Sequence, residues 1–127
     1  MNPRLLILDD EPRMAEIVGM VLRRDGFEVE TFTNSSEALA RHEQDPFDLV
    51  LTDLRMPAPD GLAVLRAVRA LDTATPVILF TAHATIANAI EALRDGAFDY
   101  IQKPFDNEAL RACVRRALAL SRLSREN

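Results

Sequence analysis

The chain has 127 residues, of which 48% are hydrophobic and 28% charged, a composition that excludes a disordered or fibrous protein and fits one soluble globular domain. The 15 Lys and Arg against 20 Asp and Glu give a net charge of −5, which argues against non-specific binding to nucleic acid or to an anionic membrane. The single cysteine, Cys113, cannot form an internal disulfide, and no apolar run reaches the roughly 18 residues of a membrane span. The start of the chain lacks the layout of a signal peptide, so we expect a cytoplasmic location.

Five short apolar runs predict five strands, at residues 5–8, 27–32, 47–52, 76–81 and 98–102. Three of the runs are nearly continuous in Leu, Ile, Val and Phe, as in strands covered on both faces. The stretches between the runs carry apolar residues at steps of three and four, which predict helices. These residues are Met14, Ile17, Val18, Val21 and Leu22; Leu62, Leu65, Val68 and Leu71; Ile86, Ala89, Ile90 and Leu93; and Leu110, Val114, Ala117 and Leu118. The second helix, around residues 36–43, has the weakest pattern.

Turn residues agree with this division of the chain. Pro12 and Asp106 stand where helices should begin, and Gly26 and Gly96 stand where helices should end. Strands alternating with helices predict an α/β fold, a doubly wound parallel sheet with helices on both faces. For a (βα)5 chain of this length the flavodoxin-like strand order 2-1-3-4-5 is favoured over half of a Rossmann domain, and ligands are expected at the carboxyl ends of the strands.

Acidic residues follow two strands that should be neighbours. Asp9, Asp10 and Glu11 come directly after the first strand, and Asp53 comes after the third. Carboxylates held close together repel one another and need a counter-charge. Because no His or Cys accompanies them, the oxygen ligands favour Mg²⁺.

A threonine and a lysine follow the last two strands. Lys103 offers a fixed positive charge and Thr81 a hydroxyl, and both groups suit the oxygens of a phosphoryl group. Asp53 could then supply the nucleophilic oxygen for phosphoryl transfer. Taken singly, each of these residues has an ordinary explanation as a helix cap, a strand residue or a surface charge. Their joint placement at the strand ends favours a functional site.

The sequence resembles the receiver domain of two-component response regulators, over essentially its whole length. The resemblance is carried by Asp9-Asp10, by the segment 53–61 (Asp-Leu-Arg-Met-Pro-Ala-Pro-Asp-Gly), by Thr81-Ala82 and by Lys103-Pro104-Phe105. It implies that Asp53 is the phosphoacceptor, phosphorylated by a sensor histidine kinase, and that the only catalysis is the domain's own phosphorylation and dephosphorylation. It also implies that Mg²⁺ is held by Asp9, Asp10, Asp53 and the backbone carbonyl of Arg55.

The resemblance assigns roles to further residues. Thr81 and Lys103 would contact the phosphoryl group, with Lys103 aimed by a cis bond to Pro104. Thr81 and Tyr100 would form a switch in which Tyr100 turns inward after phosphorylation, and Arg55 and His83 would tune the lifetime of the phosphoryl group. Gly61 is expected to supply a backbone shape that other residues resist.

Within the family, residues 81–85 and 97–106 look like the nitrogen-regulation subfamily, in which a receiver controls an AAA+ ATPase that activates transcription. This implies a receiver domain over residues 1–120, and residues 121–127 as the start of a linker to a C-terminal output domain with its own DNA-binding domain. We expect the face of the fourth helix, fifth strand and fifth helix to serve a homodimer and the contact with the downstream ATPase, with Ile86, Ile90 and Tyr100 as candidates to change exposure. We expect no membrane or nucleic-acid contact by this domain itself.

Three alternatives remain open at this stage: a stand-alone phosphorelay receiver, a flavin-binding redox domain of the same topology, and a haloacid-dehalogenase-like phosphatase. The acidic loop after the first strand argues against a flavin phosphate, and the best nucleophile follows the third strand, which argues against the phosphatase. Among the remaining residues, His42 is expected to be solvated and Cys113 to be a small packed side chain. The arginines of the last helix, Arg111, Arg115, Arg116, Arg122 and Arg125, are expected on a solvated or partner-facing side.

Overall fold

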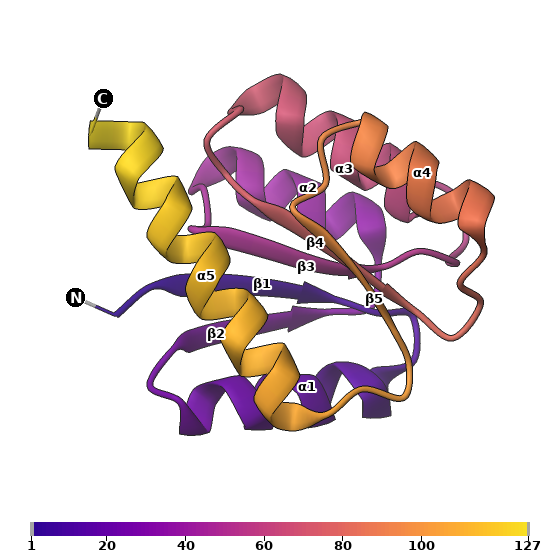
Figure 1. Ribbon diagram of the computed structural model, residues 1–127, viewed down its shortest axis with the longest axis horizontal. Coiled ribbons are helices and arrows are strands. Elements are labelled where there is room, and N and C mark those ends of the chain that lie inside the picture. The colour runs from indigo at the N-terminus through magenta and orange to yellow at the C-terminus, as the bar shows by residue number, and fades with distance from the viewer. Residues whose placement is uncertain (1, 127) are drawn as a thin grey trace.

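The structure, a computed structural model, describes residues 2–126 of the chain and the side chains of residues 2–122. Five strands alternate with five helices in these residues: β1 Arg4–Leu8, α1 Pro12–Arg24, β2 Glu28–Phe32, α2 Ser35–Gln44, β3 Leu49–Asp53, α3 Gly61–Leu71, β4 Val77–Thr81, α4 Ile86–Arg94, β5 Asp99–Gln102 and α5 Asn107–Glu126. The strands are all parallel and form one sheet in the order β2-β1-β3-β4-β5 (Figure 1). The predicted fold and strand order are confirmed.

The composition of each strand follows its place in the sheet. The three central strands, β1, β3 and β4, are buried along almost their whole length, and they are the three runs that are nearly continuous in aliphatic residues. The edge strands β2 and β5 are only partly buried and have a larger share of polar residues. In the register of the centre, Asp53 on β3 pairs with Phe80 on β4.

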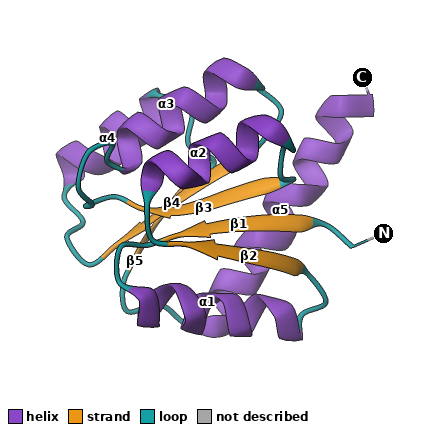
Figure 2. Ribbon diagram, turned by 180° about the vertical axis from the view of Figure 1, so that it is seen from behind, coloured by secondary structure: helices purple, strands orange, loops and turns teal. Residues whose placement is uncertain are grey.

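Helices cover both faces of the sheet, as predicted (Figure 2). On one face α1 and α5 pack on alternate strand residues, which include Ile7, Leu51 and Phe80. On the other face α2, α3 and α4 pack on the intervening residues, which include Leu6, Val50 and Leu79. Parallel strands buried by helices on both sides leave their carboxyl ends as the open edge that can carry a site.

Short polar residues and glycines set the helix boundaries. The side chains of Asn34, Asp60 and Thr85 cap α2, α3 and α4 by accepting the N–H three residues on. Gly26 and Gly96 follow α1 and α4 with φ angles of 93° and 99°, in the left-handed region that favours glycine. The weakly patterned second helix forms nevertheless, because its cap and the burial of Ala38 and His42 fix it.

The helical periodicity overestimates the core at several positions. Ile17 on α1 and Leu71 on α3 are about half exposed. On α4 the exposure is larger: Ile86 is 81% exposed, Ile90 and Leu93 are about half exposed, and only Ala92 is fully buried. The apolar residues of α4 therefore lie mainly on a free face rather than in the core.

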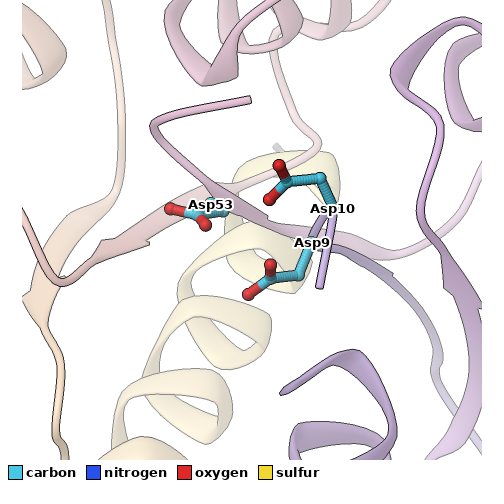
Figure 3. A group of neighbouring side chains, drawn as sticks. All are labelled: Asp9, Asp10 and Asp53. Carbon is cyan, nitrogen blue, oxygen red and sulfur yellow. The ribbon is translucent and has the colours of Figure 1, made fainter. Parts of the chain in front are cut away.

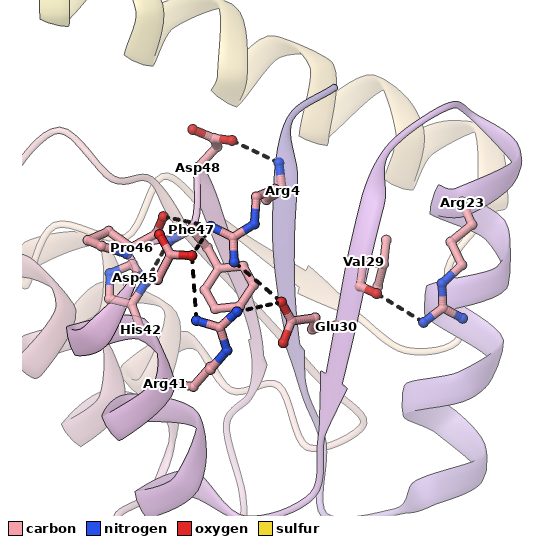
Figure 4. Close-up of polar contacts among 10 residues, drawn as sticks. All are labelled: Arg4, Arg23, Val29, Glu30, Arg41, His42, Asp45, Pro46, Phe47 and Asp48. Atoms are coloured by element: carbon pink, nitrogen blue, oxygen red, sulfur yellow. Dashed lines mark hydrogen bonds and ion pairs between the residues drawn. The ribbon is translucent and has the colours of Figure 1, made fainter. Parts of the chain in front are cut away.

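The expectation for His42 is wrong, because this residue is only 1% exposed. Figure 4 shows it beside Phe47. Its Nδ1 accepts the backbone N–H of Phe47 at 3.0 Å, and its ring stacks on that of Phe47 at a centroid distance of 6.0 Å. The guanidinium groups of Arg4 and Arg41 lie near the same phenyl ring, at 4.5 and 5.4 Å from its centroid. Nδ1 is thus paired with the backbone, whereas Nε2 is buried without a hydrogen-bond partner among the described residues.

The last helix has the character expected of it. Three of its arginines form ion pairs at the surface, Arg111 with Glu108, Arg115 with Asp25 and Arg116 with Asp99. Cys113 is packed in the core, and burial raises the pKa of its thiol to about 12. The helix continues through residues 121–126, and the side chain of Arg125 lies outside the described residues. Within residues 2–126, none of the helices combines the length and the apolar character needed to cross a membrane.

Candidate functional site

Three carboxylates meet at the carboxyl ends of β1 and β3 (Figure 3). Asp9 and Asp10 directly follow β1, and Asp53 is the last residue of β3. One oxygen from each residue lies within 4.8 Å of the others. Asp9 and Asp53 are buried, whereas Asp10 is exposed. The sheet therefore brings together the acidic residues that the sequence predicted to be neighbours.

Lys103 supplies the counter-charge inside this cluster. Its ammonium nitrogen lies 2.9 Å from Oδ2 of Asp9 and 3.3 Å from Oδ2 of Asp53, and its side chain is only 10% exposed. The backbone holds the lysine in place: its N–H donates to the carbonyl of Thr81 at 2.8 Å, and its bond to Pro104 is cis, as predicted. A residue 50 positions from Asp53 in the chain is thus paired with it.

The electrostatics of the cluster favour a cation. Burial raises the pKa of Asp53 above its ordinary value; Lys103 acts in the opposite direction and Asp9 adds to the rise. For Lys103, burial alone would lower the pKa, but the hydrogen bond to Asp9 and the charges of Asp53 and Asp9 outweigh it and hold the pKa above its ordinary value. The single positive charge of Lys103 thus neutralises only part of the negative charge of the three carboxylates.

This donor set fits Mg²⁺. The ion prefers oxygen ligands and commonly uses one or two carboxylates together with waters and phosphate oxygens. The second oxygen of Asp9 accepts the N–H of Glu11 at 2.9 Å, which fixes the orientation of that carboxylate. The exposed carboxylate of Asp10 leaves the cluster open to an ion from solvent.

Thr81 stands at the end of β4, the strand beside β3, and is fully buried. Its hydroxyl oxygen accepts the N–H of His83 at 3.0 Å. That bond uses a lone pair and leaves the hydroxyl proton for donation to another group. The geometry suits a hydroxyl that donates to an oxygen attached near Asp53.

The two residues expected to tune the lifetime of a phosphoryl group, Arg55 and His83, both have exposed side chains. The N–H of Arg55 lies 3.4 Å from Oδ1 of Asp53, so the start of the loop after β3 follows the carboxylate closely. Arg55 follows β3 and His83 follows β4, and both strands end at the site, where these exposed side chains contact solvent.

Tyr100 on β5 lies with its hydroxyl inside the protein. The hydroxyl of Tyr100 is already buried and makes no hydrogen bond of normal geometry among the described residues, although the main chain of Thr85 lies near it. Burial raises the pKa of this phenol above its ordinary value. The ring packs against the core under α3 and α4. This is the inward position that the switch assigns to Tyr100, and its link to phosphorylation stays a prediction.

Position 61 requires glycine because of a lack of space, and not because of an unusual backbone conformation as expected. Its φ is not positive, so its backbone shape is open to other residues. However, a Cβ atom on Gly61 would lie 2.3 Å from the backbone carbonyl oxygen of Asp53 and 2.7 Å from Cα of Leu54. The N–H of Gly61 donates to the carbonyl of Leu54 at 2.9 Å. The start of α3 thus packs directly on the backbone of Asp53, and only glycine leaves the room.

Phe80 is a further neighbour of the site that the sequence alone does not identify. The ring centroid of Phe80 lies 4.7 Å from the ammonium nitrogen of Lys103. The register of the strands identifies it, because the residue of β4 opposite Asp53 lies on the same face of the sheet as Asp53. Composition alone marks Phe80 only as a core residue.

The chain is similar to known proteins over nearly its whole length. A family model described as the response regulator receiver domain matches residues 5–115. The regulatory protein AtoC of Escherichia coli (strain K12) is 43% identical over 123 residues, which cover 97% of this chain and 27% of AtoC. The C4-dicarboxylate transport transcriptional regulatory protein DctD of Rhizobium meliloti (strain 1021) is 40% identical over 125 residues, 98% of this chain and 27% of DctD.

A solved structure points the same way. NtrX from Brucella abortus, in complex with ADP, matches with a TM-score of 0.92 at 34% identity, over 99% of this chain and 29% of that one. The chain thus spans about a quarter of the length of the two curated relatives. Because the family model covers most of its residues and the relatives cover nearly all of them, the chain belongs to the family of response regulator receiver domains.

Proposed function

We propose that this receiver domain accepts a phosphoryl group on the carboxylate of Asp53, in the presence of Mg²⁺, from a sensor histidine kinase or a small acyl phosphate. The observation that carries the proposal is the position of Asp53: its carboxylate is buried, faces Lys103 at 3.3 Å and shares a cluster with Asp9 and Asp10. A buried carboxylate beside a fixed cation and two further acids is suited to phosphoryl transfer.

The proposed step is a displacement at phosphorus. An oxygen of Asp53 forms a bond to the phosphorus, and the bond from phosphorus to the donor's nitrogen or oxygen breaks, with its electron pair leaving on the donor. When bound at Asp9, Asp10, Asp53 and the backbone carbonyl of Arg55, Mg²⁺ supplies positive charge to the phosphoryl oxygens. Lys103 adds a second positive charge from the buried side, and Thr81 donates its free hydroxyl proton.

Loss of the phosphoryl group requires water to reach the phosphorus. We propose that the exposed side chains of Arg55 and His83 control this approach, because each follows a strand that ends at the site. The domain's catalysis would then be limited to its own phosphorylation and dephosphorylation.

We propose that the signal leaves through α4 and β5. Thr81 is joined to the start of the next loop by its bond to the N–H of His83, so a movement of Thr81 toward the phosphoryl group would pull on that loop. The hydroxyl of Tyr100 is buried, and we propose that phosphorylation stabilises this inward packing. The exposed residues Ile86 and Ile90 on α4 would then form a contact in a homodimer or with an output domain.

The output is proposed from the relatives, which are named as regulatory proteins and are about four times as long as this chain. In a longer protein, residues 1–120 would be the receiver and residues 121–127 the start of a linker to an AAA+ ATPase with a DNA-binding domain. The setting would be the cytoplasm. A stand-alone phosphorelay receiver would use the same site, whereas a flavin domain finds no support in the acidic loop after β1.

Incubation with acetyl phosphate tests the assignment. We expect the intact mass to show one added phosphoryl group with Mg²⁺ and none when a chelator is present. Asp53→Asn keeps the shape of the side chain but lacks the nucleophilic oxygen, and should remain unmodified. Asp45→Asn, at an exposed aspartate that pairs with Arg4 and Arg41 far from the site, is the matched control and should behave as the wild type. Equal labelling of wild type and Asp53→Asn would refute the assignment.

A further inference from the structure

Phe80 lies directly below the path that Lys103 takes to the acidic cluster. The phenyl ring is fully buried on the face of the sheet covered by α1 and α5. Asp53 pairs in register with Phe80 and lies two residues beyond Leu51, which is buried on that same face. Lys103 follows β5, on the other side of β4 from Asp53. Its side chain therefore passes over the ring of Phe80 to reach the carboxylate of Asp53.

The distances show that the ammonium group stays close to the ring. Nζ of Lys103 is 4.7 Å from the ring centroid, within the roughly 6 Å over which a ring face attracts a cation. The same nitrogen is held by Asp9 at 2.9 Å and Asp53 at 3.3 Å. Phe105 packs against Phe80 nearly at a right angle, with centroids 6.1 Å apart, and so restrains the ring.

We propose that Phe80 is a positioning residue for Lys103, holding its ammonium group at the acceptor carboxylate through the face of the aromatic ring. This inference rests on the proposed function, in which Lys103 neutralises charge on the phosphoryl group. A carboxylate attracts the ammonium along particular N–H directions, whereas the ring attracts the charge whichever way the N–H bonds point. The ring therefore keeps the cation in place while its hydrogen bonds pass from carboxylate to phosphoryl oxygens.

The chain offers a direct probe of this contact. Lys103 is the only lysine in the sequence, so labelling lysine with ¹³C at the ε carbon gives a single side-chain signal in an NMR spectrum. A methylene group over an aromatic face is shielded by the ring. We expect the ε protons of the wild type to lie upfield of free lysine, and to return toward the free value in Phe80→Leu.

Site-specific replacement of Phe80 with mono-, di- and trifluorinated phenylalanine separates the charge of the ring face from its volume. Each fluorine weakens the attraction for a cation with little change in shape. We expect the rate of phosphorylation by acetyl phosphate to fall in steps, by about threefold to tenfold at three fluorines. Affinity for beryllofluoride with Mg²⁺, which imitates the phosphoryl group, should fall in parallel. Thermal stability should change little, because the packed volume is kept.

The matched control is the same series at Phe47. That ring is also buried beneath a cation, with the Arg4 guanidinium 4.5 Å from its centroid, but it belongs to the cluster around His42. Fluorination there should leave the phosphorylation rate unchanged.

The outcomes are distinguishable. If the wild type is phosphorylated but fluorination of Phe80 leaves its rate and the beryllofluoride affinity unchanged, the role of Phe80 is refuted and the proposed function stands. If the lysine ε signal is not shielded in the wild type, the contact itself is refuted. If the wild type accepts no phosphoryl group at all, the proposed function fails together with the role given to Phe80.

Discussion

The backbone N–H of Phe47 donates to Nδ1 of His42 across 3.0 Å, in a buried cluster at the opposite end of the sheet from the acidic site. The imidazole can accept this bond only while that nitrogen carries no proton. Burial lowers the pKa of His42 below its ordinary value; the charge of Asp72 opposes this, and that of Arg4 adds to it. The folded chain thus favours the neutral imidazole.

A pH dependence of stability follows from this pairing. Because the pKa of His42 is lower in the folded chain than the roughly 6.5 of an unfolded one, its contribution is fully present above that pH and is lost as the pH falls below it. We expect urea unfolding to show stability declining as the pH falls below about 6.5. In His42→Asn, whose side-chain oxygen can still accept the N–H of Phe47, this part of the decline should disappear. His83→Asn, at the exposed histidine, should keep it. An unchanged pH profile in His42→Asn would contradict the account.

Gly61→Ala tests the close packing of α3 on the acceptor strand. A Cβ atom would meet the carbonyl oxygen of Asp53 at 2.3 Å, so the backbone has to move. We expect a loss of about 2–4 kcal/mol in the free energy of unfolding, together with slower phosphorylation. Gly19→Ala in α1 is the control: its Cβ would meet only side-chain atoms, the nearest being the methyl group of Thr31 at 3.1 Å, and alanine favours a helix. Equal stability of the two variants would show that Gly61 is not confined in this way.

Arg66 on α3 forms ion pairs that restrain α4, a helix with few buried side chains. Its guanidinium donates to Asp95 at 2.8 Å and to Glu91 at 2.9 Å, while α4 buries only Ala92 completely. We expect Arg66→Ala to increase amide hydrogen exchange in α4 severalfold, and high salt to do the same to the wild type. Arg111→Ala removes a pair within α5 and should leave exchange in α4 unchanged. Unaltered exchange in Arg66→Ala would mean that the pair does not restrain α4.

Asp10→Asn separates metal binding from folding. Asp10 is the exposed member of the acidic cluster, whereas Asp9 and Asp53 are both paired with Lys103. Removing its charge relieves repulsion, so we expect a slightly higher melting temperature without metal, corresponding to less than about 1 kcal/mol. Mg²⁺ affinity, measured by titration calorimetry, should drop. A variant that is less stable without metal and binds Mg²⁺ as well as the wild type would contradict the assignment of Asp10.

Sequence reasoning succeeded where one local pattern decides the structure. The continuous aliphatic runs identify β1, β3 and β4, and the topology of a doubly wound sheet then brings Asp9 and Asp53 together. Lys103 follows in the same way, because its strand ends at the same edge.

The remaining features depend on contacts between distant segments. Burial of His42 depends on the backbone of Phe47 and on Arg4 from β1. The exposure of Ile86 depends on how α4 packs on the rest of the fold, and the spacing of apolar residues along the helix does not predict this packing. The need for glycine at position 61 arises from the backbone of Asp53, and the role of Phe80 arises from strand register.

The central claim, that Asp53 carries the phosphoryl group, is tested most directly by chemical trapping. After reaction with acetyl phosphate and Mg²⁺, borohydride reduces an aspartyl phosphate to homoserine with release of phosphate, and peptide mass spectrometry locates the altered residue. We predict homoserine at position 53 alone, and none without Mg²⁺ or in Asp53→Asn. Homoserine at Asp9 or Asp10, or phosphorylated protein with an unaltered Asp53, would contradict the account.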